Sequence, residues 1–290
     1  MKIVPFTSSS IAGDVQEPDF LLKHKSCPRI VHFYFTYVSS DSKLYICMEY
    51  CHYNLKTFLE MPENTSNIQL MIRLFLQCCE GLQYLHSRNI VHRDMKLANI
   101  LIDARLDVKI CDFGISKKLD ATMLSTFCGT GFYMSPEVCK GQYSFSADNW
   151  SLCASFHHHL KGEAPYFNNK KEGDYGILEH KIACTNYNEL TPKECSDADF
   201  RDIINNVLSN KPDKRLELDE IIDMLTISSE YKSNYKAKSD AIEQLNDSDN
   251  WDKDPNLDDK DLPKDGKDFE SEFDNPTNRV KQEIVKRGET

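Results

Sequence analysis

Residues 91–114, VHRDMKLANILIDARLDVKICDFG, contain the pattern that decides the fold. Asp94 is followed by Lys96 two positions later and by Asn99 five positions later, and Asp112 comes 13 residues after Asn99. These side chains supply carboxylate and amide oxygens, which Mg²⁺ prefers together with phosphate, and an ammonium that can neutralise a transferring phosphoryl group. A further carboxylate could accept a hydroxyl proton. The spacing therefore predicts a phosphate-handling site built from two adjacent loops.

The same stretch resembles the catalytic loop H-R-D-L-x-x-x-N and the D-F-G signature of eukaryotic protein kinases, in order and at the family's separation. Only Met95 departs from the loop pattern. The resemblance implies that Asp94 is the catalytic base, that Asn99 and Asp112 hold Mg²⁺, and that Lys96 contacts the γ-phosphate of ATP. Lys96 also implies the Ser/Thr type, because tyrosine kinases usually lack a lysine at this point.

Other family segments occur in the expected order. The run LYICMEYC resembles the hinge between the two kinase lobes, which would make Met48 the gatekeeper. The resemblance implies that the backbone of Glu49 and Cys51 meets the edge of adenine, and that Leu101 packs beneath the adenine ring.

The run STFCGTGFYMSPE resembles the end of a kinase activation segment, in which Thr130 would bond near the catalytic base. The resemblance further implies that Glu137 pairs with Arg215 and that Asp148 braces the catalytic loop. The matching motifs extend over residues 1–228.

Control by phosphorylation is a further hypothesis drawn from the family. An arginine before the catalytic Asp, here Arg93, often accompanies activation-segment phosphorylation, and Thr122, Ser125 and Thr126 lie in the corresponding window. A phosphate at one of them could pair with Arg93, so an upstream kinase is a candidate partner.

The wider sequence predicts an α+β, two-lobed body. Two apolar, β-branched and aromatic runs indicate strands, later segments show helical periodicity, and two short strands lie between them. The expected strands are 28–38, 43–50, 99–103 and 108–113, and the expected helices are 67–87, 148–160, 197–208 and 218–225. We assign residues 1–51 to a partial, β-rich N-lobe with the hinge, 52–228 to a mainly helical C-lobe, and 229–290 to a disordered, charged and acidic tail.

The N-terminal region departs from the family pattern. Gly13 is the sole glycine before Gly81, so the glycine-rich hairpin that covers the ATP phosphates is missing from the sequence, and the N-lobe is interpreted as truncated. MKIV resembles the end of the V-A-I-K strand, which makes Lys2 a candidate phosphate-binding lysine. Its expected partner is Glu17, although Pro18 disfavours a helix interior there; Asp14 and Asp19 are alternatives. Weak ATP affinity is expected.

The net charge and the composition limit the classes of partner that this chain is expected to bind. The net charge of −11 disfavours nucleic acid and anionic membranes, and no apolar run approaches the ~18 residues of a spanning helix. The 11 cysteines lack a C-x-x-C pair and are interpreted as mostly reduced, buried thiols. We expect a cytoplasmic protein, with the nucleus as an alternative.

Two functions remain open at this point. The first is ATP- and Mg²⁺-dependent phosphorylation of Ser/Thr hydroxyls on protein substrates. The second is a catalytically impaired, kinase-like binding or scaffold module, and a truncated product of a longer kinase would reconcile the two. CDFGIS resembles MAP kinase kinases, whereas CGTGFYMSPE also resembles never-in-mitosis-type kinases, so the subfamily is unresolved.

Overall fold

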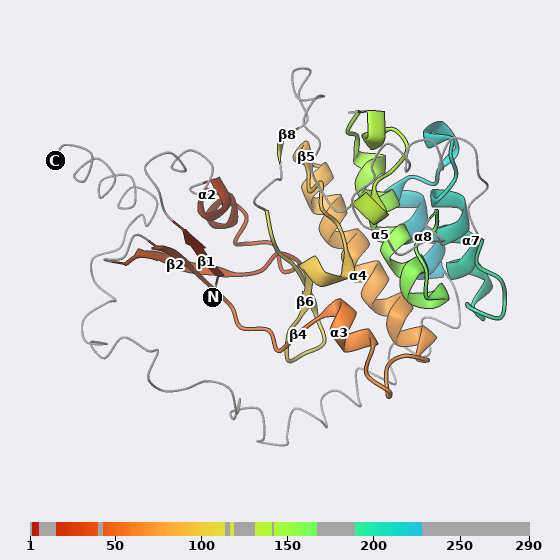
Figure 1. The fold of residues 1–290 in the computed structure, drawn as a ribbon, viewed down its shortest axis with the longest axis horizontal. Helices are drawn as coiled ribbons and strands as arrows, with labels where there is room; N and C mark the ends of the chain where they lie inside the picture. The colour runs from red at the N-terminus through yellow and green to blue at the C-terminus, as the bar shows by residue number, and fades with distance from the viewer. Residues whose placement is uncertain are drawn as a thin grey trace.

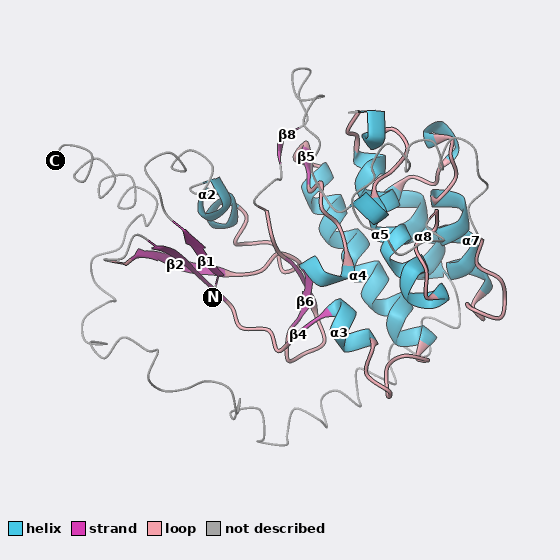
Figure 2. Ribbon diagram, in the orientation of Figure 1, coloured by secondary structure: helices cyan, strands magenta, loops and turns pink. Residues whose placement is uncertain are grey.

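The computed structural model describes residues 2–5, 16–39, 43–113, 117–118, 131–140, 142–166 and 189–227. A small strand-rich lobe with one helix lies beside a larger helical lobe (Figures 1 and 2), which confirms the predicted α+β, two-lobed architecture. The predicted tail and the activation-segment positions fall outside the described residues; those positions are Thr122, Ser125, Thr126 and Thr130.

The small lobe is built on a three-stranded antiparallel sheet in the order β1-β3-β2. Its strands are β1 (Lys2–Pro5), β2 (Phe33–Val38) and β3 (Lys43–Met48). Along β3, Leu44 and Ile46 are fully buried while their neighbours are more exposed, the period-two pattern of a strand with one face on a core. Helix α2 (Gln16–Lys23) packs against β2 and contributes Leu21 to this core.

Helix α2 resolves the conflict that Pro18 poses in the sequence. The helix begins at Gln16, so Glu17 and Pro18 both lie in its first turn. Proline is tolerated there because the backbone N–H that it lacks would have no acceptor within the helix. A carboxylate in the same turn also faces the positive end of the helix dipole. Pro18 therefore marks the start of the helix and leaves Glu17 on it.

The first predicted strand is too long at its N-terminal end. β2 begins at Phe33, and the preceding residues instead lie beside β7 (Val108–Ile110). Ile30 forms an isolated parallel bridge with Ile110, whose N–H donates to Arg29 O at 2.8 Å and whose carbonyl accepts from Val31 N at 3.0 Å. The β-branched residues that suggested a strand are thus buried between the lobes and not in the small-lobe sheet.

The large lobe is arranged around the long helix α4 (Ile68–His86), close to the predicted 67–87. Asn67 caps this helix by accepting a hydrogen bond from Leu70 N at 3.1 Å. The other described helices are α3 (Leu55–Leu59), α5 (Phe145–Lys161), α7 (Ala198–Val207) and α8 (Leu218–Ile227). Two small sheets, β4-β6-β7 and β5-β8, lie on its side nearest the small lobe; they use β4 (Tyr53–Asn54), β5 (Ile90–Val91), β6 (Ile100–Ile102) and β8 (Lys117–Lys118).

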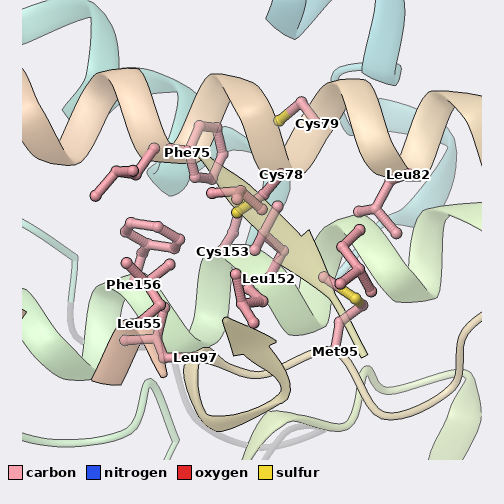
Figure 3. Close-up of a cluster of buried hydrophobic side chains, with 14 of the residues drawn as sticks. Leu55, Phe75, Cys78, Cys79, Leu82, Met95, Leu97, Leu152, Cys153 and Phe156 are labelled. Carbon is pink, nitrogen blue, oxygen red and sulfur yellow. The ribbon is translucent and has the colours of Figure 1, made fainter. Parts of the chain in front are cut away.

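Aromatic rings and thiols fill the centre of the large lobe (Figure 3). The ring of Phe75 on α4 meets Phe156 of α5 and Phe200 of α7 edge-on, at centroid distances of 5.0 and 5.1 Å. Cys78 and Cys153 lie in the same cluster, and burial raises the pKa of both thiols. All cysteines that the structure describes are free and most are buried, as predicted. None of the helices in the described ranges has the length and apolar character needed to cross a bilayer.

A buried ion pair ties the segment 131–140 to the end of the large lobe. Arg215 donates from Nη1 and Nη2 to the two carboxylate oxygens of Glu137 at 2.6 and 3.0 Å, and from Nε to Ser209 O at 3.0 Å. Its guanidinium also lies over the ring of Trp150, 4.4 Å from the centroid. Because Arg215 is buried, removing either partner of this ion pair would leave a costly unpaired charge.

Helix α4 approaches β7 closely at Gly81, and this contact can be tested. A Cβ at position 81 would lie 2.6 Å from Ile110 Cδ1 and 3.2 Å from Arg29 Cβ. We expect Gly81→Ala to lower the free energy of unfolding by about 1–3 kcal/mol, because the added methyl group overpacks this contact. The helix propensity of alanine, which is better than that of glycine by about 1 kcal/mol, opposes this loss only in part. Urea denaturation of the full chain measures this.

The control is the double variant Gly81→Ala/Ile110→Val, which removes the clashing Cδ1 atom. Ile110→Val alone should cost about 0.5–1.5 kcal/mol, but the pair should cost clearly less than the sum of the two single variants. Strictly additive losses would show that the clash at Ile110 is not what makes glycine necessary.

Candidate active site

The loop between β5 and β6 brings three of the sequence-predicted residues together. Asp94 Oδ2 accepts hydrogen bonds from Lys96 Nζ at 2.7 Å and from Asn99 Nδ2 at 2.9 Å. Asn99 Nδ2 also donates to the backbone oxygen of Asp94 at 2.9 Å, and Asn99 is buried. Each contact to the carboxylate is charge-assisted, so the orientation of Asp94 is well defined.

The arrangement of Asn99 and Asp112 fits Mg²⁺. Because the Asn99 amide nitrogen donates to Asp94, its Oδ1 atom is the end left to face a cation. The carbonyl of Asn99 accepts from Cys111 N at 3.0 Å, which holds the residue next to Asp112. No group of three or more His, Cys, Asp or Glu side chains suited to a metal occurs within the described ranges. Asn99 and Asp112 would supply two hard oxygen ligands, which suits Mg²⁺ because this ion usually completes its coordination with phosphate and water.

Asp148, from the first turns of α5, holds the loop from behind. Its buried carboxylate accepts from His92 N at 2.8 Å and from Arg93 N at 2.9 Å, and its Oδ2 atom lies 3.0 Å from His86 Nε2. Arg93 has a φ of 73°, a left-handed conformation that costs a non-glycine residue of order 1–3 kcal/mol. The hydrogen bond that the Arg93 N–H donates to Asp148 supports that conformation directly.

His92 is a packed structural histidine. The ring is fully buried, with Nδ1 accepting from Asp94 N at 3.3 Å and Nε2 lying 3.0 Å from Cys111 O. Since Nδ1 accepts, the proton is assigned to Nε2, which donates to the carbonyl of Cys111. The ring thus links the loop that carries Asp94 to the segment after β7 that carries Asp112.

Helix α2 of the small lobe reaches the site through Glu17. Its Oε1 atom accepts from Phe113 N at 3.1 Å, and the ring of Phe20 stacks on that of Phe113 at a centroid distance of 4.4 Å. Asp112 itself has a φ of 65°, so the chain turns sharply between β7 and Phe113. Glu17 therefore lies beside Asp112.

Lys2 lies on β1, where its Cα pairs with that of Ile46, but its side chain is outside what the structure describes. The Lys2–Glu17 pair stays a prediction. The side chain of Arg93 lies over the ring of Tyr143, 4.5 Å from its centroid. The phosphorylation window that would face Arg93 lies outside the described residues, as does Thr130.

At the hinge, hydrogen bonds select which backbone groups can meet a ligand. Glu49 N donates to His32 O at 2.8 Å, so the predicted contact of Glu49 with an adenine edge would have to use its carbonyl and not its N–H. Met48 ends β3, and Leu101 is the central residue of β6. Burial raises the pKa of the Cys51 thiol to about 12, and the negative charge of the nearby Glu49 carboxylate is the second largest cause of this rise. Cys51 is therefore a neutral thiol.

Sequence reasoning missed a polar junction that supports the site from the lobe interface. Arg29 donates to Glu80 Oε2 at 2.8 Å, Gln77 Oε1 at 3.0 Å and Asp107 Oδ1 at 2.9 Å, and Gln77 Oε1 also accepts from Val108 N at 2.7 Å. The available signal was Gln77 itself, a polar residue at a buried position of an apolar helix. His86, beside Asp148, was also missed; its place at the end of α4 gave no comparable signal.

The role of Asp148 can be measured without any ligand. In Asp148→Asn one amide oxygen replaces two carboxylate oxygens, so at least one of the two loop N–H groups loses its acceptor, at a cost of about 1–3 kcal/mol. We expect the amide hydrogens of His92 and Arg93 to exchange roughly tenfold faster or more.

The matched control is Asp219→Asn on α8, where the carboxylate accepts from Gln83 Nε2 at 2.6 Å on the surface. That variant should leave the exchange of both loop amides unchanged. Equal exchange rates in Asp148→Asn and the unaltered chain would contradict the bracing role.

Comparison with known proteins places this geometry in a family. The model of the protein kinase domain matches residues 7–225. The chain is 33% identical over 205 residues to a probable serine/threonine-protein kinase of Zea mays, covering 69% of this chain and 32% of the relative. It is 32% identical over 219 residues to serine/threonine-protein kinase PLK4 of Aedes aegypti, covering 74% and 27%.

A third relative, the cell cycle serine/threonine-protein kinase CDC5/MSD2 of Saccharomyces cerevisiae, is 33% identical over 208 residues, covering 69% of this chain and 28% of the yeast protein. The chain thus spans about a third of the length of the curated relatives it matches. The relatives range from cell cycle kinases to a protein kinase C, so they select neither of the two subfamilies that short runs resemble. The chain belongs to the eukaryotic protein kinase family, with relatives of the Ser/Thr type.

Proposed function

We propose that this chain transfers the γ-phosphate of ATP to serine or threonine hydroxyls of protein substrates. The observation that carries the proposal is the Asp94 carboxylate, held by Lys96 Nζ at 2.7 Å and by Asn99 Nδ2 at 2.9 Å on a loop braced by Asp148. A kinase-like binding module has no evident need to hold a carboxylate, an ammonium and an amide in this arrangement.

The residues divide the chemistry among them. Asp94 accepts the proton of the attacking hydroxyl and orients its oxygen, as a general base does. Lys96, already next to Asp94, places its positive charge where the transferred phosphoryl group carries negative charge. Asn99 Oδ1 and Asp112 would hold Mg²⁺, which supplies charge neutralisation on the phosphate oxygens when bound.

Nucleotide binding is assigned to the hinge segment and the residues on either side of it. The Glu49 carbonyl and the Cys51 backbone would hydrogen-bond the adenine edge, with Met48 behind the ring and Leu101 beneath it. Lys2 would contact the α- and β-phosphates, oriented by Glu17. The position of Glu17 on α2, bonded to Phe113 N, supports its part in this assignment.

Regulation is the finer part of the proposal. We assign Thr122, Ser125 and Thr126 as acceptor sites for an upstream kinase, with Arg93 as the partner of the added phosphate and Thr130 as a contact near the catalytic base. The free thiols of the described residues fit a reducing compartment, the cytoplasm or the nucleus.

The central test replaces Asp94 by asparagine. Without a base, Asp94→Asn should transfer phosphate from Mg·ATP to a generic protein substrate roughly 10²–10⁴-fold more slowly than the unaltered chain. Phosphoamino-acid analysis of the product should show phosphoserine or phosphothreonine.

The control is Asp213→Asn, an equal charge change at an exposed position of the large lobe, which should keep full activity. If the unaltered chain transfers phosphate no faster than Asp94→Asn, the enzyme assignment fails, and a binding or scaffold module becomes the better interpretation.

Regulation has its own test. We expect the triple variant Thr122→Ala/Ser125→Ala/Thr126→Ala to lose activation-segment phosphate, found by mass spectrometry, and to lose activity several-fold or more, because Arg93 then has no phosphate to pair with. Unchanged phosphate content and activity in this variant would refute the assignment while leaving the Asp94 result untouched.

A further inference from the structure

An acidic and apolar groove lies on the large lobe, between α7 and α8. The groove is open, has a volume of about 520 Å³, and is lined by Asp199, Leu216, Glu220, Asp223, Met224 and Ile227. Met224 is 36% and Ile227 74% exposed, so two large apolar side chains meet solvent next to three carboxylates. Such a combination is typical of a surface that binds a basic, amphipathic segment.

Helix α8 presents this surface as a regular stripe. Leu218, Ile221 and Leu225 face the core. Glu220, Met224 and Ile227 follow the spacing i, i+4, i+7, so they share a second face of the helix, turned away from that core. The helix therefore has an apolar edge that none of the described residues of the large lobe covers.

The chain itself contains a segment of matching chemistry. Residues 279–287, RVKQEIVKR, carry four basic side chains and one acidic one, in contrast to the acidic sequence before them. In a helix, Val280 and Ile284 would share one face, with Arg287 one turn further along. This segment is short enough to need a partner surface in order to be helical.

We propose that residues 279–287 dock as a short amphipathic helix into the groove between α7 and α8. Val280 and Ile284 would cover Met224 and Ile227, and the basic side chains would face Asp199, Glu220 and Asp223. The aromatic residues of the intervening sequence, such as Phe269 and Phe273, are flanked by Asp and Glu and would be repelled by the same carboxylates.

Chain length permits this contact. About 50 residues join Ile227 to Arg279, and a chain can span up to about 3.3–3.6 Å per residue, so the length of this connection does not prevent the segment from reaching the groove. The tether gives the segment a high effective concentration near the groove, so a weak intrinsic affinity is sufficient. Figure 1 shows α7 and α8 on the side of the large lobe away from β1 and β2, so the groove is separate from the small lobe.

Zero-length crosslinking of the full chain tests the proposal. A carbodiimide joins a lysine amine directly to a carboxylate, so Lys281 and Lys286 should form amide crosslinks with Asp199, Glu220 or Asp223. A mixture of unlabelled and ¹⁵N-labelled chains, analysed by mass spectrometry, separates links within one chain from links between copies.

Two variants keep both lysines and all three carboxylates. Met224→Ser/Ile227→Ser removes the apolar edge, and Arg279→Glu/Arg287→Glu removes the complementary charge. Each should reduce the intrachain crosslinks roughly tenfold, and raised salt should reduce them too. The matched control, Tyr34→Ser/Tyr37→Ser on β2, alters two exposed apolar residues of the other lobe and should change nothing.

Intrachain crosslinks that both variants abolish would establish the docking. Crosslinks between labelled and unlabelled copies would overturn it in favour of a second copy of this chain in the groove. Crosslinks that survive both variants, or that spread evenly over other exposed carboxylates such as Asp213, would overturn it as unspecific proximity. None of these results depends on whether the chain transfers phosphate.

Discussion

The two hydrogen bonds that the N–H groups of His92 and Arg93 donate to the Asp148 carboxylate are the constraint on which the catalytic loop depends. A buried carboxylate is costly unless its oxygens are satisfied, and here backbone donors and His86 satisfy them. The same hydrogen bonds hold the backbone at Arg93 in the left-handed conformation that leads into Asp94. The loop geometry therefore rests on helix α5, far along the chain.

A second set of contacts joins this loop to the small lobe. His92 Nε2 meets Cys111 O, and two residues later Phe113 N donates to Glu17 on α2. The other end of α2 leads to Arg29, whose guanidinium lies among groups of α4 and the turn before β7. Contacts from both lobes consequently position Asp112. A shift of α2 would therefore change the position of the residue that is proposed to bind Mg²⁺.

Local patterns predicted the bounds of the large-lobe helices well because these helices carry long runs of apolar residues into one core, as α4 does around Phe75. They predicted strands less well. Residues 29–31 have the composition of a strand, yet they pair with Ile110 at the lobe interface, because β-branched residues suit any buried extended backbone. Pro18 marked a helix boundary correctly, but only the position of α2 shows that Glu17 remains on the helix.

The sequence alone determined the family, the fold class and the identity of the residues around Asp94, because Asp94, Lys96 and Asn99 lie within six positions and their spacing reflects one local loop. Tertiary structure alone decided how that loop is supported. The groups that support the loop come from distant parts of the chain. More than 50 residues separate Asp148 from Arg93, Glu17 from Phe113 and Arg29 from Asp107. Whether a carboxylate meets a backbone N–H across such a sequence separation depends on how the buried helices pack. No local sequence pattern encodes the distance in space between the two groups.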